Sequence, residues 1–332
     1  MHRTLHRAAT LFALTIALML PLAARAQGGF LHGTETIVDS DIPVAYYLVE
    51  TVDGLYVPIG LRKPEGPGPF PIVVFASGNG GGGMEWVRDA SHNRSWTLDR
   101  FLDAGYAVVW MRYRAEVELG FNKDERLVED IRQGRQLLNR GPLEIDDEIA
   151  IVEFLKTLPF VDPDRVAHVG MSHGGEMAMK VTSQYHGLAA AVANEPASHE
   201  FLGLTPDDTA FIAADTGMWN IEEMQMRDAS ATRERINLEL ARERVSGITT
   251  PILVHGRDDD ELQGIFRLTY EVLAEAGKET EWESYNHGEH GFVYVERDPD
   301  GQYRPDELQI EVVMDTIAWL DRYLKPEPMT RR

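Results

Sequence analysis

The sequence predicts an α/β fold in which a mostly parallel central sheet is covered by helices on both faces. Three observations indicate it. Continuous apolar runs at residues 72–76, 106–111 and 251–255 are typical of strands buried on both sides. Stretches with helical periodicity separate these runs, and such alternation favours parallel strands joined by crossover helices. A serine flanked by glycines also stands between a strand and a helix within residues 166–185.

A β-hairpin is predicted over residues 44–62. Apolar and polar residues alternate on both sides of Asp53 and Gly54, a pair that favours a tight turn. Pro58 in the second arm cannot donate a backbone hydrogen bond, so we expect that arm to be an edge strand. A proline- and glycine-rich linker then leads into the buried strand 72–76, and a glycine-rich loop, 78–83, follows directly.

The remaining elements alternate as the fold class requires. From helical spacing, capping residues and terminating prolines we predict helices at 95–104, 146–158, 262–276 and 306–324. Apolar runs predict strands at 106–111, 166–169, 188–193, 251–255 and 281–285. The stretch 198–247 is too long for an ordinary connection and has its own helical pattern, so we expect a helical insertion near the active site. No second core is expected in a chain of 332 residues.

The N-terminal residues 1–26 have the layout of a secretory signal peptide. Arg3 and Arg7 precede an apolar run that is short for a membrane span, and Ala24-Arg25-Ala26 provides an A-x-A cleavage pattern. We therefore expect an exported protein, periplasmic or secreted, with a catalytic domain at 27–332. No stable membrane insertion is expected after cleavage.

Charge and cysteine content exclude several classes of function. The formal net charge of −22 repels phosphate backbones and anionic lipids, so nucleic acid and membrane surfaces are poor partners. The chain has no cysteine, which excludes thiol catalysis, thiolate metal sites and disulfides. No His-Glu-x-x-His pattern is present, and we expect neither a metal nor a cofactor. The sequence does not indicate an oligomeric state.

Ser172 is the candidate nucleophile. It lies in Gly170-Met-Ser172-His-Gly174, after an apolar strand and before a helix. A nucleophile elbow requires this order, because the serine sits on a turn too sharp for side chains on either side. The N-terminus of the following helix favours developing negative charge. Since glycine and serine also form plain turns, the hypothesis depends on a base and an acid further along the chain.

Suitable acids and bases follow the later strands. In a parallel sheet, ligands bind beyond the carboxyl ends of the strands, so side chains just after strands 251–255 and 281–285 should reach the same rim as Ser172. A serine hydroxyl needs a base to take its proton, and the base needs an acid to hold its tautomer. The candidates in these positions are Asp258, Asp259, Asp260, His287 and His290.

With serine, aspartate and histidine in this chain order, the sequence resembles the α/β-hydrolase superfamily over residues 44–324. It is most similar to the branch that contains dienelactone hydrolases and the catalytic domains of prolyl oligopeptidases. Three segments carry the resemblance: 158–166 leading into the elbow, 255–259 (His-Gly-Arg-Asp-Asp) and 290–292 (His-Gly-Phe). The resemblance implies an α/β-hydrolase fold.

Position by position, the resemblance places the triad acid at Asp259 and the base at His290. Asp258 and Asp260 stay open as alternatives for the acid, and His287 for the base. Acyl transfer also requires an oxyanion hole of backbone N–H groups. We expect one donor at His173, next to the nucleophile, and the other in the glycine-rich loop at Asn79 or Gly80.

Four further charged residues have two interpretations each. Glu176, in the first turn of the elbow helix, and Glu195, at a strand end, either contact a cationic or hydroxylated substrate or serve the helix dipole and capping. Arg112, like Arg114, either binds a carboxylate or pairs with nearby acids. The sequence leaves these alternatives open.

The function expected is hydrolysis of a small-molecule carboxylic ester through an acyl-enzyme intermediate. An ester is favoured over a peptide for two reasons. Fewer than fifty residues precede the first core strand, whereas the oligopeptidases normally carry a large β-propeller there. The Arg-Gly-Ser sequence of the oligopeptidases is also replaced here by Arg114-Ala115-Glu116. Dienelactone hydrolases use a cysteine nucleophile, which this chain lacks. The alternatives are a peptidase or aminoacyl-amide hydrolase and, from another class, a non-catalytic binding protein with this fold.

Overall fold

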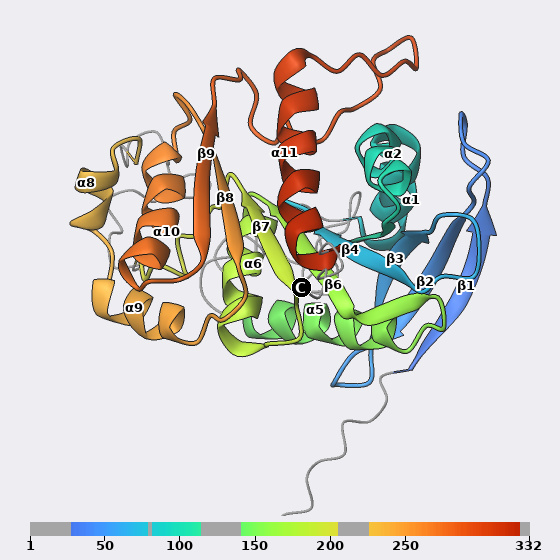
Figure 1. Ribbon diagram of the computed structural model, residues 1–332, viewed down its shortest axis with the longest axis horizontal. Coiled ribbons are helices and arrows are strands. Elements are labelled where there is room, and N and C mark those ends of the chain that lie inside the picture. The colour runs from blue at the N-terminus through green and yellow to red at the C-terminus, as the bar shows by residue number, and fades with distance from the viewer. Residues whose placement is uncertain (1–27, 79–81, 114–140, 205–225, 326–332) are drawn as a thin grey trace, which may run out of the picture.

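A computed structural model of the protein describes residues 28–78, 82–113, 141–204 and 226–325 (Figure 1). Within them one sheet has the strand order β1-β2-β3-β5-β4-β6-β7-β8-β9. The strands are β1 (Gly29–Glu35), β2 (Val44–Glu50), β3 (Tyr56–Arg62), β4 (Phe70–Ala76), β5 (Ala107–Met111), β6 (Val161–Met171), β7 (Ala190–Asn194), β8 (Ile252–Arg257) and β9 (Thr280–Tyr285). From β4 to β9 they pair in parallel, while β1, β2 and β3 are antiparallel. The predicted fold class is confirmed.

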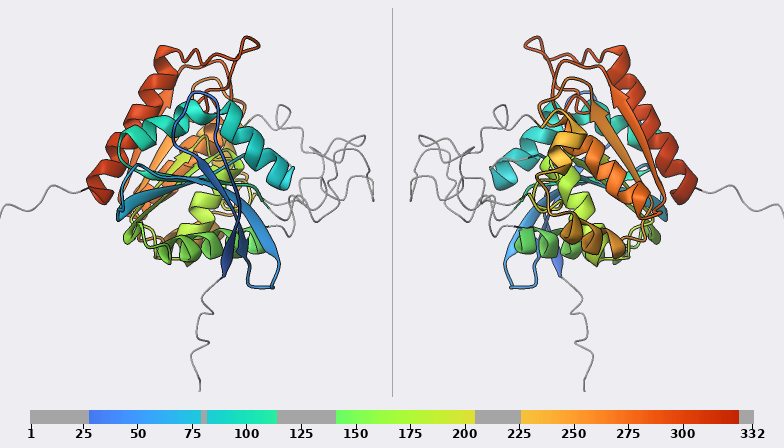
Figure 2. Two further views of the ribbon diagram at one scale, coloured as in Figure 1. Left: turned by 90° about the vertical axis from the view of Figure 1, so that its right-hand side faces the viewer. Right: turned by 90° about the vertical axis from the view of Figure 1, so that its left-hand side faces the viewer.

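Helices cover both faces of the sheet (Figures 1 and 2). One face carries α1 (Gly83–Asn93), α2 (Ser95–Asp103) and α11 (Glu307–Leu324). The other carries α5 (Gly141–Lys156), α6 (His173–Gln184), α9 (Leu238–Ser246) and α10 (Gln263–Glu275), with the short α8 (Ala229–Arg233) packed on α10. The helices thus leave the carboxyl ends of the parallel strands as a common rim.

The apolar runs are continuous because both sides of each central strand are buried. Successive side chains of a strand point to opposite faces. In β4, Val73 and Phe75 pack in the cluster that contains α2 and α11, whereas Ile72 and Val74 pack against α5. Burying each such side chain contributes about 1.5–3 kcal/mol, so this double layer fixes the sheet rigidly beneath the rim.

Pro58 lies in an interior strand, so the prediction of an edge arm at this position is wrong. Strand β3 lies between β2 and β5. Its pairing with β5 begins only at Ile59, so the nitrogen of Pro58 is not required to donate in that ladder. The edge is β1, which we did not predict because most of its side chains are intermediate or exposed and show no apolar alternation.

Strand β6 begins earlier than predicted. It starts at Val161, although Pro163 follows within the expected linker. Val161 pairs with Phe70, the register then shifts, and regular pairing resumes where Val166 faces Ile72. Pro163 therefore lies in an irregular section where no ladder hydrogen bond is lost.

Several predictions fall wholly or partly outside the described residues. The signal peptide at 1–26, loop residues Asn79 and Gly80, and residues 205–225 of the predicted insertion lie there. In the described part of that insertion, α9 occupies the expected helical pattern and packs against α6 and α10. None of the helices in the described ranges is both long and apolar enough to cross a membrane.

Candidate active site

Ser172 forms the sharp turn between β6 and α6. Its φ of 56° and ψ of −112° put a residue with a side chain in a conformation that costs about 1–3 kcal/mol. The Ser172 N–H donates to the Asn194 carbonyl at 2.9 Å, and the Ser172 carbonyl accepts from the Ala197 N–H at 3.0 Å. These bonds to the end of β7 and the residues after it hold the turn in place. The backbone is that of a nucleophile elbow.

Gly170 and Gly174 are required by close backbone approach. A Cβ on Gly170 would lie 1.9 Å from the Gly174 carbonyl oxygen. A Cβ on Gly174 would lie 2.1 Å from the Ala76 carbonyl oxygen, at the end of β4. Neither backbone atom can move without displacing the elbow, so the structure supplies the steric reason for both glycines.

Helix α6 and the end of β4 border the region where the sequence predicts an oxyanion hole. His173 begins α6, and N–H groups of a first helical turn point out of the helix end. Its buried side chain is held from behind, where Nε2 lies 2.8 Å from Glu144 Oε2. Gly78 lies beside the elbow, since a Cβ on it would be 3.5 Å from Ser172 Cβ. The glycine-rich loop therefore starts next to the nucleophile.

Arg112 anchors the start of that loop. Its Nη1 donates to Ser77 Oγ at 2.7 Å and to the Gly78 carbonyl at 2.8 Å. The hydroxyl of Tyr113 donates to the Ser77 carbonyl at 2.8 Å. Arg112 is buried, with its guanidinium 4.6 Å from the centre of the Trp86 ring. These contacts give it a structural role at the rim.

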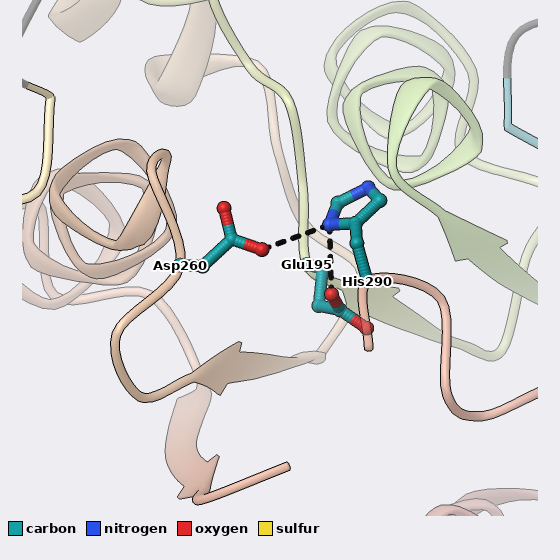
Figure 3. A group of neighbouring side chains, drawn as sticks. All are labelled: Glu195, Asp260 and His290. Carbon is teal, nitrogen blue, oxygen red and sulfur yellow. Dashed lines mark hydrogen bonds and ion pairs between the residues drawn. The ribbon is translucent and has the colours of Figure 1, made fainter. Parts of the chain in front are cut away.

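His290 is held by two carboxylates (Figure 3). Its Nδ1 lies 3.0 Å from Asp260 Oδ2 and 2.8 Å from Glu195 Oε2, and its second ring nitrogen points away from both. The adjacent Gly291 lies against the elbow strand, because a Cβ there would be 3.2 Å from Met171 Cε. The structure thus brings the histidine loop beside the residue that precedes Ser172. In the described part of the chain, Ser172 and His290 themselves are not hydrogen-bonded to each other.

Asp260, rather than the predicted Asp259, is the aspartate that contacts His290. Asp259 has a φ of 61° and an exposed side chain, and its carbonyl accepts from Arg227. Asp260 is buried, and its second oxygen accepts the Leu262 N–H at 2.7 Å. The left-handed turn at Asp259 directs that side chain to solvent and the next one inward. Asp258 is engaged elsewhere, by the hydroxyl of Ser284.

His287, the alternative base, does not contact Glu195 or Asp260. Its Nε2 lies 3.0 Å from Asp306 Oδ2 at the start of α11, and its ring stacks on Phe292 with centroids 4.6 Å apart. It helps to fix the loop between β9 and α11. Glu176 is also structural, because it is buried in a salt bridge with Lys180 and accepts the Phe201 N–H.

Glu195 is the residue whose role the sequence did not reveal. It follows β7 directly, has a φ of 44°, and its side chain is 1% exposed. Both of its oxygens accept the Gly291 N–H, at 3.0 and 3.1 Å, in addition to the contact with His290. The position of Glu195 at a strand end was the one sign of a role at the site, but its partner, His290, lies far along the chain.

The two carboxylates favour the protonated form of His290. Burial by itself would lower the pKa of His290, but hydrogen bonds and charge from Asp260 and Glu195 outweigh it and raise the pKa to about 9. Burial likewise would raise the pKa of Asp260, but its bonds with His290 and Leu262 lower it overall. The site is thus built to stabilise an imidazolium.

Comparison with known proteins places the chain in a family. The family model described as the prolyl oligopeptidase family matches residues 91–327, which include Ser172, Asp260 and His290. The chain belongs to the prolyl oligopeptidase family. This confirms the predicted branch of the α/β-hydrolase superfamily.

The curated relatives that this chain matches are longer than the chain itself. An uncharacterized peptidase, YuxL, of Bacillus subtilis is 26% identical over 249 residues, covering 72% of this chain and 34% of the relative. The 2,6-dihydropseudooxynicotine hydrolase of Paenarthrobacter nicotinovorans is 28% identical over 142 residues, covering 43% of this chain and 32% of the relative. The chain spans about a third of the length of each.

Solved structures show the same fold at low identity. Acetyl xylan esterase 1 from Thermoanaerobacterium sp. has a TM-score of 0.56 at 16% identity, with 89% of this chain and 88% of the esterase covered. Acylaminoacyl peptidase of Pyrococcus horikoshii has a TM-score of 0.58 at 17% identity, with 92% of this chain and 51% of the peptidase covered. These likenesses confirm the α/β-hydrolase fold of this family member.

The cluster of Glu195, Asp260 and His290 also has the composition of a metal site. One ligand atom from each lies within 4.8 Å of the others. In this family member, however, Arg257 already supplies a cation: its Nε and Nη2 donate to Asp260 Oδ2 at 2.9 and 2.5 Å, and its Nε lies 3.5 Å from Glu195 Oε2. The donor geometry therefore fits a hydrogen-bonded acid–base site better than a metal centre.

A hollow of about 610 Å³ opens beside His290, between the loop after β9 and the start of α11. Phe292, Tyr294 and Asp306 are among its lining residues, and Ser172 is not. A substrate carbonyl must reach Ser172, so this hollow by itself does not define where the acyl group binds.

Proposed function

We propose that the protein is an exported serine hydrolase that cleaves a small carboxylic ester through an acyl-enzyme intermediate. The observation that carries the proposal is the strained Ser172 elbow beside a loop whose histidine is fixed by buried carboxylates. A strained serine at a helix N-terminus together with an acid-held imidazole is the arrangement that activates a hydroxyl for acyl transfer.

Each residue has a definite step in this reaction. Ser172 Oγ attacks the ester carbonyl while His290 Nε2 takes its proton. Asp260 accepts the Nδ1–H, which fixes the tautomer and stabilises the imidazolium. His290 then gives the proton to the departing alcohol, and water, activated by the same imidazole, releases the acid. The His173 N–H and a donor from residues 79–80 would stabilise the tetrahedral oxyanion, a contribution of about 10²–10³ in rate for one donor.

The preference for esters is supported by the esterases among the solved structures with this fold. Acetyl xylan esterase 1 and an esterase from Rhizomucor miehei are two of them. The alternative, cleavage of a peptide or aminoacyl amide, is favoured by the family name and by the peptidase among the curated relatives. Export rests on the signal-like residues 1–26.

A substrate panel tests this proposal. The full chain and its Ser172→Ala variant would be assayed with p-nitrophenyl esters of acyl chains of increasing length and with aminoacyl and dipeptidyl p-nitroanilides. We expect the esters to be turned over with higher kcat/KM than the anilides, and both activities to vanish in the variant. Faster anilide turnover would favour the peptidase, and no turnover by folded protein would favour a binding protein.

A further inference from the structure

We propose that Glu195 is a second acid of this site, a positioning residue that shares the Nδ1–H of His290 with Asp260 and fixes the loop that carries the histidine. The inference rests on the proposed function and deepens it. A single aspartate is enough for a serine triad. A second, buried carboxylate at hydrogen-bond distance therefore needs its own explanation.

The two carboxylates reach one nitrogen from neighbouring strands. Strands β7 and β8 are adjacent, and the Glu195 N–H donates to the His255 carbonyl of β8 at 2.8 Å. Glu195 comes directly after β7, and Asp260 lies in the turn after β8. Figure 3 shows the two side chains converging on Nδ1 from different directions. Glu195 Oε2 lies 2.8 Å and Asp260 Oδ2 lies 3.0 Å from Nδ1. The sheet itself sets this geometry.

Glu195 also fixes the backbone beside the histidine. Its two oxygens accept the Gly291 N–H at 3.0 and 3.1 Å, while Oε2 contacts His290 Nδ1. One side chain thus holds both the imidazole and the next peptide group. Gly291 in turn lies against Met171, the neighbour of Ser172. Glu195 therefore connects the position of the base to the position of the nucleophile.

Arg257 allows two carboxylates to be buried at this point. It donates to Asp260 and lies 3.5 Å from Glu195 Oε2, so its charge offsets their mutual repulsion. Among the residues that the structure describes, Glu195 and Asp260 contact the imidazole Nδ1, and Arg257 contacts both carboxylates. The Phe266 ring stacks on the imidazole, with the two ring centroids 6.2 Å apart. With a protonated His290 the charges of this group balance, which favours the imidazolium formed when Ser172 loses its proton.

Sharing predicts that the two acids compensate for each other. If either carboxylate can accept the Nδ1–H, removal of one leaves the other in place, and only removal of both leaves the imidazole without an acceptor. Residues that act as one unit show such non-additive effects on rate. A residue that merely stabilised the fold would reduce activity by the same factor in either background.

A double-mutant cycle in the full chain tests this. The variants are Glu195→Gln, Asp260→Asn and the combination, assayed for kcat and KM on the best ester of the panel. We expect Glu195→Gln alone to lower kcat about tenfold with little change in KM, and to lower it at least about 10²-fold in the Asp260→Asn background. Equal factors in the two backgrounds would overturn the proposal.

The charge-matched control is Glu283→Gln. Glu283 is exposed on β9, opposite His255 in the register, and does not contact His290. The Glu283→Gln substitution removes one negative charge near β8, and we expect this variant to keep the kcat of the wild type. If Glu195→Gln does not fold, Glu195→Asp keeps the carboxylate, and we expect it to restore more activity than Glu195→Ala. No difference between Asp and Ala in folded protein would contradict the role of the carboxylate.

A readout independent of activity separates failure of this proposal from failure of the proposed function. The pKa of His290 would be measured by NMR on histidine-labelled wild type, Glu195→Gln and Glu283→Gln. We expect a lower pKa of His290 in Glu195→Gln only. An unchanged pKa would reject Glu195 as an acid even in an active enzyme. A lowered pKa in a protein without turnover would reject the hydrolase and retain the contact.

Discussion

Asp260 Oδ2 lies 3.0 Å from His290 Nδ1, while the preceding residue, Asp259, points to solvent. The turn between β8 and α10 decides which of three consecutive aspartates enters the site. The positive φ of Asp259 reverses the chain, and the N–H of Leu262 then holds Asp260 inward.

Asp260→Asn and Asp259→Asn should therefore differ. We expect Asp260→Asn to lower kcat/KM about 10²-fold, because Asn can present an amide N–H to Nδ1 and thereby favour the wrong tautomer. Glu195 can still accept the Nδ1–H, which limits the loss. Asp259→Asn should stay within about threefold of wild type, since an exposed side chain contributes little. Steady-state kinetics on one ester checks both. The opposite ranking would restore the assignment made from the sequence.

The glycines of the elbow should tolerate no side chain. We expect Gly174→Ala to destabilise the protein by at least about 2 kcal/mol, because its Cβ would lie 2.1 Å from the Ala76 carbonyl oxygen. Gly33→Ala is the control, since a Cβ there meets nothing within 4 Å. Denaturant unfolding measures the difference. Equal stability of the two variants would mean that the elbow is less tightly packed than described.

Activity should rise with pH. His290 must be neutral to accept the proton of Ser172, and its pKa is raised to about 9. We therefore expect kcat/KM to increase as the pH approaches that value and to level off above it. A plateau that already begins near pH 7 in the free enzyme would show that the carboxylates do not hold the imidazolium.

The raised pKa of His290 also makes the stability of the fold depend on pH. The folded pKa of His290 lies above the unfolded value of about 6.5, so its contribution is fully present below that pH and is lost as pH rises through about 9. His290→Gln should thus lose more stability relative to wild type at pH 6 than at pH 9.5. Urea unfolding at both pH values measures it, and a difference of opposite sign would contradict the account.

Arg112 should support the start of the glycine-rich loop beside Ser172. Arg112→Met would leave the buried Gly78 carbonyl and Ser77 hydroxyl without this donor, at a cost of about 1–3 kcal/mol. We expect kcat to fall more than KM rises, because the loop beside Ser172 would lose its anchor. Arg100→Met on the exposed side of α2 is the control. Equal kinetics in the two variants would place Arg112 outside the catalytic rim.

Much of the fold was predictable because its strands are buried on both faces. The runs that became β4, β5 and β8 are continuous and apolar for that reason. Strand β1 was missed because an exposed edge strand has no such pattern. Pro58 was misassigned because its tolerance depends on where the ladder with β5 begins, which is a tertiary fact.

The site was predictable where local geometry dictates residue type. The glycines on either side of Ser172 are needed because the backbone of an elbow is too crowded for side chains at these positions. The choice among Asp258, Asp259 and Asp260 depends on one backbone dihedral that spacing cannot reveal. Glu195 could not be linked to His290, because the contact joins segments brought together only by the packing of β7 against β8.

Mass-spectrometric mapping of the adduct formed with a fluorophosphonate shows directly whether Ser172 is an activated nucleophile. We expect one adduct per chain, on the peptide that contains Ser172, and much slower labelling of His290→Ala. A folded wild-type protein that remains unlabelled, or an adduct on another residue, would contradict it.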